Sequence, residues 1–162
     1  MASQLKVVSD TGTLESLSDR IRPYLAEIAS RANATEEARA VPNENIEIAR
    51  KAGFVRAFVP KQYGGDERSL KDYNQAIRLI TKACPSTGWV TGVLNVHQSG
   101  VMHYRKGLQD EIWKNGPDTV ICSSVSPIIK AELVDGGILV NGNGRWSSGS
   151  DHAEWAGVGV KL

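Results

Sequence analysis

The stretch from Ile46 to Asp66 reads IEIARKAGFVRAFVPKQYGGD and combines several local signals. A helix is predicted from Glu44 to Ala52, because Asn43 is a favoured N-cap residue and Gly53 suits the end of a helix. A compact apolar run follows, and Gly64-Gly65 then indicates a turn. The stretch therefore predicts a helix, a buried connection and a tight turn.

Helical periodicity continues on both sides of this stretch. Apolar residues recur at steps of three and four from Leu14 to Ile28, with an interruption at Pro23, which breaks or bends a helix. Residues 33–39 are polar and are predicted to be a connection. Downstream, Ser69 is expected to cap a strong helix that ends near Cys84-Pro85.

A further helix is predicted to begin at Ser86. It is apolar nearly all round between Trp89 and Val96, so we expect it to be buried. A short helix follows from Leu108 to Trp113 and is closed by Gly116-Pro117. The first part of the chain is therefore predicted to be all-helical.

The pattern changes from helical to alternating after Pro117. The segments with strand character are 119–125, 131–134, 138–140 and 155–160. Asp135-Gly136-Gly137 predicts a hairpin between the second and third of them. Helices followed by strands indicate the α+β class, with domains at 1–117 and 118–162. No turn follows the last strand, so we expect a chain cut short whose unpaired edge associates with another chain.

The composition excludes several classes of protein. The chain has 162 residues, with 19 Lys and Arg, 18 Asp and Glu, and a net charge of +1. This balance gives no bulk attraction to nucleic acid or anionic membranes. No segment is apolar for long enough to cross a membrane, and the N-terminus lacks a signal-peptide core. Cys84 and Cys122 have no metal-type spacing, so we predict reduced thiols, no metal site and a cytoplasmic protein without nucleic-acid or membrane partners.

A cluster of polar residues near the end of the chain resembles a hydrolase triad only superficially. Ser147, Ser148 and Ser150 stand beside Asp151 and His152. Triad members meet through the fold and are seldom adjacent along the chain. The Gly-x-Ser-x-Gly pattern of a nucleophile elbow is also missing from the sequence. A hydrolase is therefore disfavoured.

The order of the motifs is more specific than any single residue. The ordered segments are 46–66, Cys84-Pro-Ser-Thr-Gly-Trp89, Gln109–Trp113, Cys122-Ser-Ser-Val-Ser-Pro127 and Trp146–Trp155. Together they resemble the acyl-CoA dehydrogenase superfamily, and within it the oxygenase component of two-component flavin-dependent aromatic monooxygenases. The chain is similar to the 4-hydroxyphenylacetate and 3-hydroxy-seco-androstane-trione hydroxylases of that family, from about residue 18 to the last residue.

The resemblance implies a fold for the whole protein. Members of the family have an N-terminal all-α domain, a middle antiparallel β-barrel and a C-terminal four-helix bundle, assembled as a tetramer. On this comparison the chain holds the helical domain and the first half of the barrel, and is truncated before the bundle. The resemblance therefore implies a homo-oligomer at full length and an inactive fragment in isolation.

The resemblance also implies an activity. Such an oxygenase hydroxylates a phenolic or other small aromatic substrate with O2 and reduced FMN or FAD, through a C4a-hydroperoxyflavin. A separate NAD(P)H flavin reductase supplies the reduced flavin. Two alternatives stay open: an acyl-CoA dehydrogenase-type flavoprotein, and a non-catalytic fragment. Ser-Val-Ser-Pro at 124–127 stands where dehydrogenases carry Thr-Glu-Pro, which disfavours the first alternative.

Two residues match catalytic positions of the family. On the residues alone, His97 is either a core histidine or a functional group; the resemblance places it near the phenolic hydroxyl, where histidine acts as an acid or base. The resemblance places the Ser148 hydroxyl at flavin N5, with Ser147 as the candidate if the register differs by one. In an extended segment Ser148 and Trp146 would share a face and Ser147 would point away.

The resemblance implies further cofactor-binding residues. Trp89 matches an aromatic residue that packs on flavin or substrate, and Trp146 opens the motif that carries the flavin-binding serines. Ser123 and Ser124 match strand residues that bind flavin through main chain and hydroxyl. These residues, with Ser147 and Ser148, form the predicted cofactor site.

Overall fold

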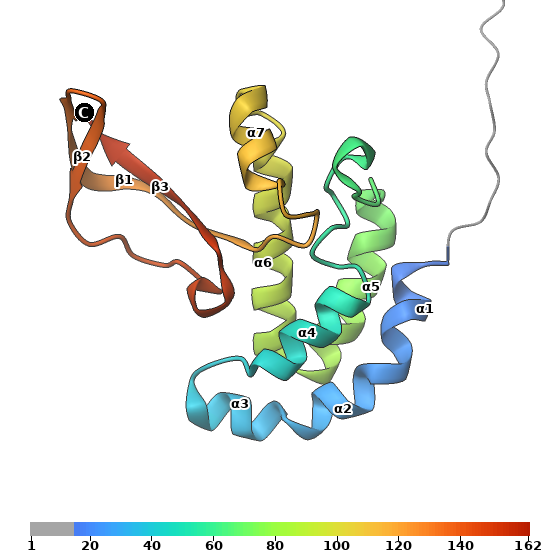
Figure 1. Ribbon diagram of the computed structural model, residues 1–162. Helices are drawn as coiled ribbons and strands as arrows, with labels where there is room; N and C mark the ends of the chain where they lie inside the picture. Colours follow the sequence, from blue (N-terminus) through green and yellow to red (C-terminus); the bar gives the residue numbers. More distant parts are fainter. Residues whose placement is uncertain (1–14) are drawn as a thin grey trace, which may run out of the picture.

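The computed structural model describes residues 15–162, which form a group of helices and a small sheet that extends away from them (Figure 1). The α-helices are α1 Leu17–Ile21, α2 Leu25–Ser30, α3 Ala32–Ala38, α4 Asn43–Lys51, α5 Leu70–Ala83, α6 Pro85–Val101 and α7 Lys106–Ile112. Short 3-10 helices are η1 Arg22–Tyr24, η2 Lys61–Tyr63 and η3 Ser150–His152. The strands are β1 Ile121–Val134, β2 Gly137–Asn141 and β3 Trp155–Lys161. The predicted α+β class is confirmed.

The first predicted helix is divided at Pro23. This residue lies in η1, where its ring and missing N–H interrupt the hydrogen bonding between α1 and α2. Leu14 lies outside the described residues. The predicted polar connection over 33–39 is wrong, because α3 occupies most of it. Ala and Glu favour helix there, and the buried Thr35 hydroxyl donates to the Arg31 carbonyl at 2.8 Å.

The stretch 46–66 folds as predicted except at the start of its helix. Gly53 has a φ of +88° directly after α4, where glycine carries no steric cost. Asn43 is the first residue of α4 and not its cap; Pro42 takes that position. The Asn43 side chain has a different partner, since its Oδ1 lies 2.9 Å from His152 Nδ1. Tertiary contact therefore outcompetes local capping here.

The turn after this segment requires glycine at position 65. A Cβ atom there would lie 1.9 Å from the Val59 carbonyl oxygen. The two chain segments are held at this close approach by main-chain hydrogen bonds, from Glu67 N to Val59 O at 3.3 Å and from Arg68 N to Ala57 O at 2.6 Å. The Gly64-Gly65 signal therefore marks a close approach of main chain as well as a turn.

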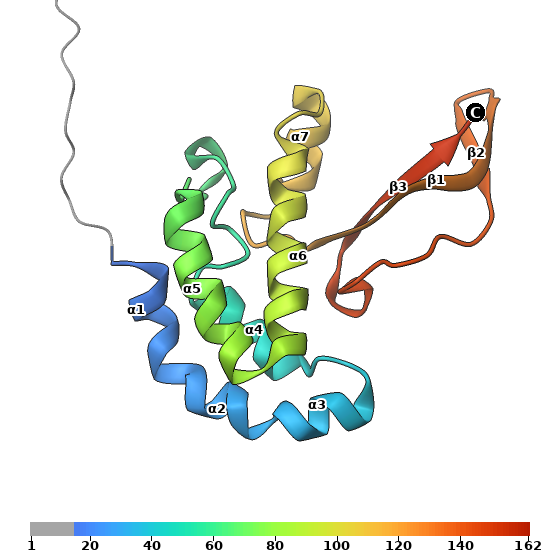
Figure 2. The same ribbon diagram turned by 180° about the vertical axis from the view of Figure 1, so that it is seen from behind.

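The main core lies where α1 and α2 pack on α5, and α4 contributes side chains to it. Its buried side chains include Leu17, Ile21, Ile28, Ala49, Phe54, Tyr73, Ala76 and Ile80. Ser69 caps α5 as predicted, since its hydroxyl oxygen accepts from Asp72 N at 3.2 Å. Helices α5 and α6 lie side by side in both views (Figures 1 and 2), and α6 begins at Pro85, one residue before the predicted start.

Helix α6 is buried on its polar side, so the prediction that it is buried all round is wrong. Trp89 is 65% exposed and Val96 is 53% exposed. The buried face instead carries Thr87, Thr91, Asn95 and Gln98 beside the apolar Leu94 and Val101. The physical reason is that Thr87, Asn95 and Gln98 meet hydrogen-bonding groups of other segments. The buried Thr91 hydroxyl has no such partner among the described residues.

The polar contacts of α6 reach several distant segments. With its nitrogen facing the Phe54 and Val55 carbonyls, Asn95 donates to them at 2.8 and 3.0 Å. The Gln98 amide nitrogen donates to the Thr119 carbonyl. Tyr73 of α5 donates to the Thr91 carbonyl at 3.2 Å, and burial raises the pKa of Tyr73 well above its ordinary value, so its hydroxyl stays a donor. A buried amide that loses its partner costs about 1–3 kcal/mol, so these contacts fix α6 in one orientation.

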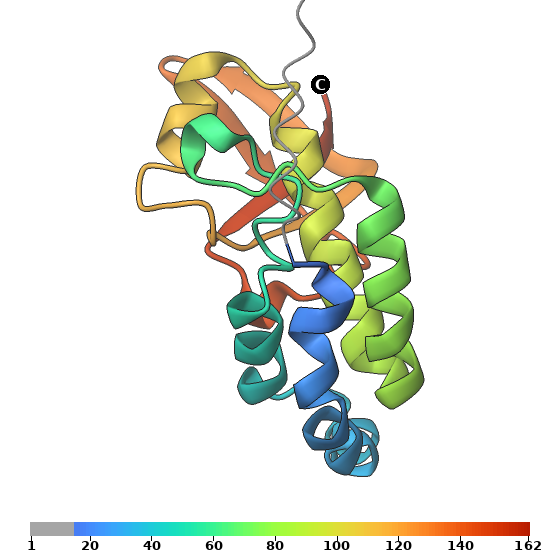
Figure 3. The same cartoon turned by 90° about the vertical axis from the view of Figure 1, so that its right-hand side faces the viewer.

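The sheet has the order β2-β1-β3 and lies to one side of the helices (Figures 1 and 2), so that the view from the helical side shows it behind them (Figure 3). The predicted segments 119–125 and 131–134 merge into the single strand β1. The hairpin to β2 is confirmed, with Val134 paired to Gly137 in an antiparallel register. The expectation of a wholly antiparallel sheet is wrong for β3, which pairs parallel to β1 from Ile121↔Trp155 onward. The reason is that the chain returns from β2 through residues 142–154 to the start of β1 before β3 begins.

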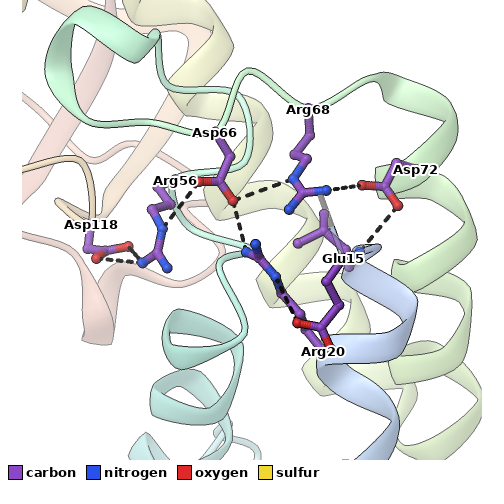
Figure 4. A network of polar contacts seen from close by, with 8 residues as sticks. Glu15, Arg20, Arg56, Asp66, Arg68, Asp72 and Asp118 are labelled. Atoms are coloured by element: carbon purple, nitrogen blue, oxygen red, sulfur yellow. Dashed lines mark hydrogen bonds and ion pairs between the residues drawn. The ribbon is translucent and has the colours of Figure 1, made fainter. Parts of the chain in front are cut away.

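An ion-pair network joins the helices to the start of the sheet (Figure 4). Arg56 Nη1 binds both carboxylate oxygens of Asp118, at 3.0 and 2.9 Å. Asp66 accepts from Arg20 at 3.0 Å, and Arg68 donates to Asp72 at 3.1 Å. These side chains are partly buried, so their charges are less screened than those of surface pairs. The network fixes the connection that leads into β1.

Among residues 15–162, no helix is both long and apolar enough to cross a membrane. The domain division after residue 117 stays a prediction. In the structure α7 ends at Ile112 and β1 begins at Ile121.

We expect Gly65→Ala to lower the free energy of unfolding by about 3 kcal/mol, because the Val59 carbonyl cannot move aside without breaking main-chain hydrogen bonds. Urea denaturation followed by circular dichroism measures the change. Gly107→Ala is the matched control, since a Cβ there meets no atom within 4 Å. It should be neutral or stabilise α7 by about 0.5–1 kcal/mol. Equal effects of the two substitutions would contradict the close approach at position 65.

Candidate functional site

His97 on α6 pairs with Ser123 on β1. His97 Nε2 lies 2.8 Å from Ser123 Oγ, and Nδ1 lies 3.0 Å from the Ile121 carbonyl oxygen. A carbonyl oxygen only accepts, so Nδ1 carries a proton. In the neutral ring Nε2 then accepts the Ser123 hydroxyl proton. The structure therefore gives His97 a hydroxyl partner on a strand, with the ring orientation set by main chain.

The His97–Ser123 pair lines a cavity of about 550 Å³. Its other walls include Val96, Tyr104, Val125 and Val158. Gly157 is paired with Ser123 in the sheet register, and a Cβ at Gly157 would lie 3.4 Å from Ser123 Cβ. The cavity thus combines mainly apolar walls with a hydroxyl and an imidazole, which is the usual character of a small-molecule site.

Ser148 lies against the start of α6. Trp89 Nε1 donates to Ser148 Oγ at 3.1 Å. The next residue, Gly149, has a φ of +82°, and a Cβ there would lie 2.5 Å from Leu94 Cδ2. Glycine therefore lets the serine segment approach α6 closely enough for this hydrogen bond.

Both Ser147 and Ser148 line a second cavity, of about 640 Å³. Trp89 and His152 contribute to the same cavity. The expected alternation of side chains does not hold, because residues 146–147 have no regular secondary structure and residues 148–149 form a turn. Ser147 therefore does not point away from this space, although its main-chain carbonyl is engaged with Ser150 N at 3.1 Å.

Trp146 and Ser124 occupy different environments. Trp146 is 89% exposed, with a φ of +62° that is uncommon outside glycine. Ser124 is buried, and its hydroxyl donates to the Arg145 carbonyl at 3.0 Å. Ser124 thus holds the main chain directly before Trp146, and Trp146 presents an uncovered aromatic surface.

Four of the predicted site residues form two pairs, and each pair contains one residue of α6. His97 with Ser123 forms one group, and Trp89 with Ser148 forms the other. Eight residues separate Trp89 and His97, which corresponds to about 12 Å along the axis of α6. The two pairings span 26 and 59 residues, and no local sequence signal reveals either. The contact of His97 with the Ile121 carbonyl and the close approach at Gly149 were not predicted from the sequence either.

The structure gives the residues of the superficial hydrolase pattern other partners. His152 Nδ1 is directed to Asn43 Oδ1. Ser148 accepts from Trp89, and Ser150 uses its main-chain N–H to bond Ser147. The disfavoured hydrolase interpretation therefore gains no support from the geometry.

Comparison with curated proteins finds relatives that share a common description. The chain is 44% identical over 144 residues to the p-hydroxyphenylacetate 3-hydroxylase oxygenase component of Acinetobacter baumannii, covering 89% of this chain and 34% of the relative. It is 37% identical over 140 residues to the flavin-dependent monooxygenase oxygenase subunit HsaA of Rhodococcus jostii (strain RHA1), covering 86% and 37%. The chain thus spans about a third of the length of these relatives.

The structural comparison agrees with the sequence comparison. The crystal structure of 3-HSA hydroxylase from Rhodococcus sp. RHA1 superposes with a TM-score of 0.85 at 36% identity, over 90% of this chain and 38% of that one. The family described as acyl-CoA dehydrogenase, N-terminal domain, matches residues 11–110. Because this match includes most of the helical part and the hydroxylase structure superposes on 90% of the chain, the chain belongs to the acyl-CoA dehydrogenase family as an N-terminal segment.

Proposed function

We propose that the chain is the N-terminal part of the oxygenase component of a two-component flavin-dependent monooxygenase that hydroxylates a phenolic substrate. The observation that carries the proposal is the His97–Ser123 pair in an apolar cavity. The names of the relatives support the reaction class. The proposal includes O2 as co-substrate, reduced FMN or FAD as cofactor, a separate NAD(P)H flavin reductase as partner, and a homo-oligomer as the complete enzyme.

The His97–Ser123 pair provides a path for a phenolic proton. Ser123 donates its proton to His97 Nε2 and keeps a lone pair that can accept from the substrate hydroxyl. As the phenol O–H bond breaks, its proton passes to Ser123 Oγ, and the Ser123 proton passes to Nε2. The imidazolium that results is stabilised by the Nδ1–H bond to the Ile121 carbonyl. The substrate becomes a phenolate, whose ortho carbon is more nucleophilic than that of the neutral phenol.

The residues of the second group, together with their sequence neighbours Trp146 and Ser147, have side chains of the kind that bind a flavin. Trp146 offers an uncovered aromatic face for stacking, and the Ser148 hydroxyl keeps a free proton while it accepts from Trp89. Trp146, Ser147, Ser148 and Trp89 would hold the ring system, and Ser123 and Ser124 lie on the neighbouring strand. When bound, the reduced flavin would supply two electrons to O2, so that one oxygen atom is transferred to the substrate and the other leaves as water. The mainly apolar walls of the cavity beside His97 and Ser123 limit the access of water to the reacting groups.

We expect His97→Asn in the complete protein to slow hydroxylation of 4-hydroxyphenylacetate by about 10²–10⁴-fold, since it removes the group that accepts the proton. Rapid-quench single-turnover experiments with reduced flavin measure the rate. Ser123→Ala should also slow the reaction, because it interrupts the proton path. Anaerobic titration should give an unchanged Kd for reduced flavin in His97→Asn. A hydroxylation rate within a few-fold of wild type for His97→Asn would make His97 a structural core residue.

We expect Ser148→Ala to raise the ratio of hydrogen peroxide to hydroxylated product roughly tenfold, because the hydroxyl contributes one hydrogen bond of about 0.5–1.5 kcal/mol to the flavin. Peroxide and product are quantified in the same single-turnover samples. Ser30→Ala, at an exposed position at the end of α2 away from this cavity, is the control and should leave the ratio unchanged. A larger effect of Ser147→Ala than of Ser148→Ala would move the assignment by one residue.

A further inference from the structure

We infer that Trp89 is a positioning residue whose indole N–H orients the Ser148 hydroxyl toward the flavin; the inference rests on the proposed function. Its direct observation is the hydrogen bond of 3.1 Å from Trp89 Nε1 to Ser148 Oγ. The role differs from the stacking role that the resemblance implies, because it acts through the single polar atom of the indole and not through its ring face.

Both ends of this hydrogen bond are held by close helix contacts. Gly88, directly before Trp89, is packed against α5, since a Cβ there would lie 2.3 Å from Thr81 Oγ1. Gly149, directly after Ser148, is packed against Leu94 of α6 in the same way. A larger residue at either glycine would move donor and acceptor apart. Close main-chain packing therefore holds the backbone of both residues at the separation that this bond requires.

The exposure of Trp89 makes the contact informative. Trp89 is 65% exposed, so water could satisfy its indole N–H. The hydrogen bond to Ser148 is therefore not required to compensate for burial of the N–H. The ring stands between the serine cavity and an apolar groove between α5 and α6 that is lined by Ile77, Val93 and Val96. Trp89 thus lines both the serine cavity and the apolar groove, and its indole N–H is directed at Ser148.

The hydrogen bond constrains what Ser148 can do. A serine hydroxyl has one proton to donate and two lone pairs that accept. The indole N–H only donates, so it occupies one lone pair of Ser148 Oγ, and Trp89 cannot accept the Ser148 proton. The proton stays free for a ligand in the cavity, and the side-chain rotamer is restricted. Ser147 lines the same cavity, but the bond selects Ser148.

The hydrogen bond is tested first without flavin. The complete protein is labelled with 5-fluorotryptophan, and Trp89→Phe assigns the Trp89 signal in the ¹⁹F NMR spectrum. Ser148→Ala should shift this signal, whereas Ser30→Ala, on α2 and outside the cavity that Trp89 lines, should leave it in place. Circular dichroism confirms that each variant is folded. An unchanged Trp89 signal in folded Ser148→Ala would overturn the inference, whatever the reaction of the enzyme.

A double-mutant cycle then separates positioning from packing. Trp89→Phe keeps an aromatic ring and removes the N–H, and it should raise the peroxide-to-product ratio about three- to tenfold. In the Ser148→Ala background the same substitution should have no further effect, because the hydroxyl it orients is already gone. An equal effect in both backgrounds would show that Trp89 acts by packing and would overturn the inference.

The two tests keep this inference apart from the proposed function. If wild-type protein fails to bind reduced FMN or FAD in anaerobic titrations and forms no hydroxylated phenol, the proposed function is overturned. The ¹⁹F experiment then still decides whether Trp89 holds Ser148. If the wild-type protein hydroxylates a phenol but Trp89→Phe and Ser148→Ala have additive effects, the proposed function is supported and the positioning role of Trp89 is overturned.

Discussion

The structure depends on the hydrogen bonds made by the buried polar side of α6. Asn95 holds the main chain at 54–55, Gln98 holds Thr119, and Thr87 accepts from Asn45 at 2.9 Å. A rotation of the helix by one residue, roughly 100°, would leave these groups buried without partners. Apolar contacts tolerate small rotations because they have no direction, whereas these amides do not. One orientation of α6 is therefore strongly preferred.

That orientation decides what α6 presents to the cavities. With Asn95 and Gln98 turned inward, His97 faces the first residues of β1 and Trp89 remains at the surface. A helix buried by apolar contact alone would have placed Trp89 and Val96 in the core and left His97 without its strand partner. The candidate site is thus a consequence of polar packing elsewhere on the same helix, and its two groups are fixed relative to each other by a rigid element.

The sequence predicts those parts of the fold that local chemistry decides. The cap at Ser69, the break at Pro23 and the turn between β1 and β2 each rest on a few adjacent residues, and all are confirmed. The burial of α6 was not predictable in this way. Its apolar residues surround the helix almost evenly, so periodicity gives no direction, and the partners that decide it lie in distant segments.

The same distinction explains the sheet and the candidate site. The parallel pairing of β3 depends on the path of residues 142–154, which local alternation does not describe. Along that path Gly149 appears in the sequence as one of several glycines in a turn-rich segment, yet it is the position where the chain approaches Leu94. Motif order identified Ser148 and Trp89 as separate candidates. Only this close approach brings them within hydrogen-bond distance, so the relation between the two residues is a property of the fold and not of either motif.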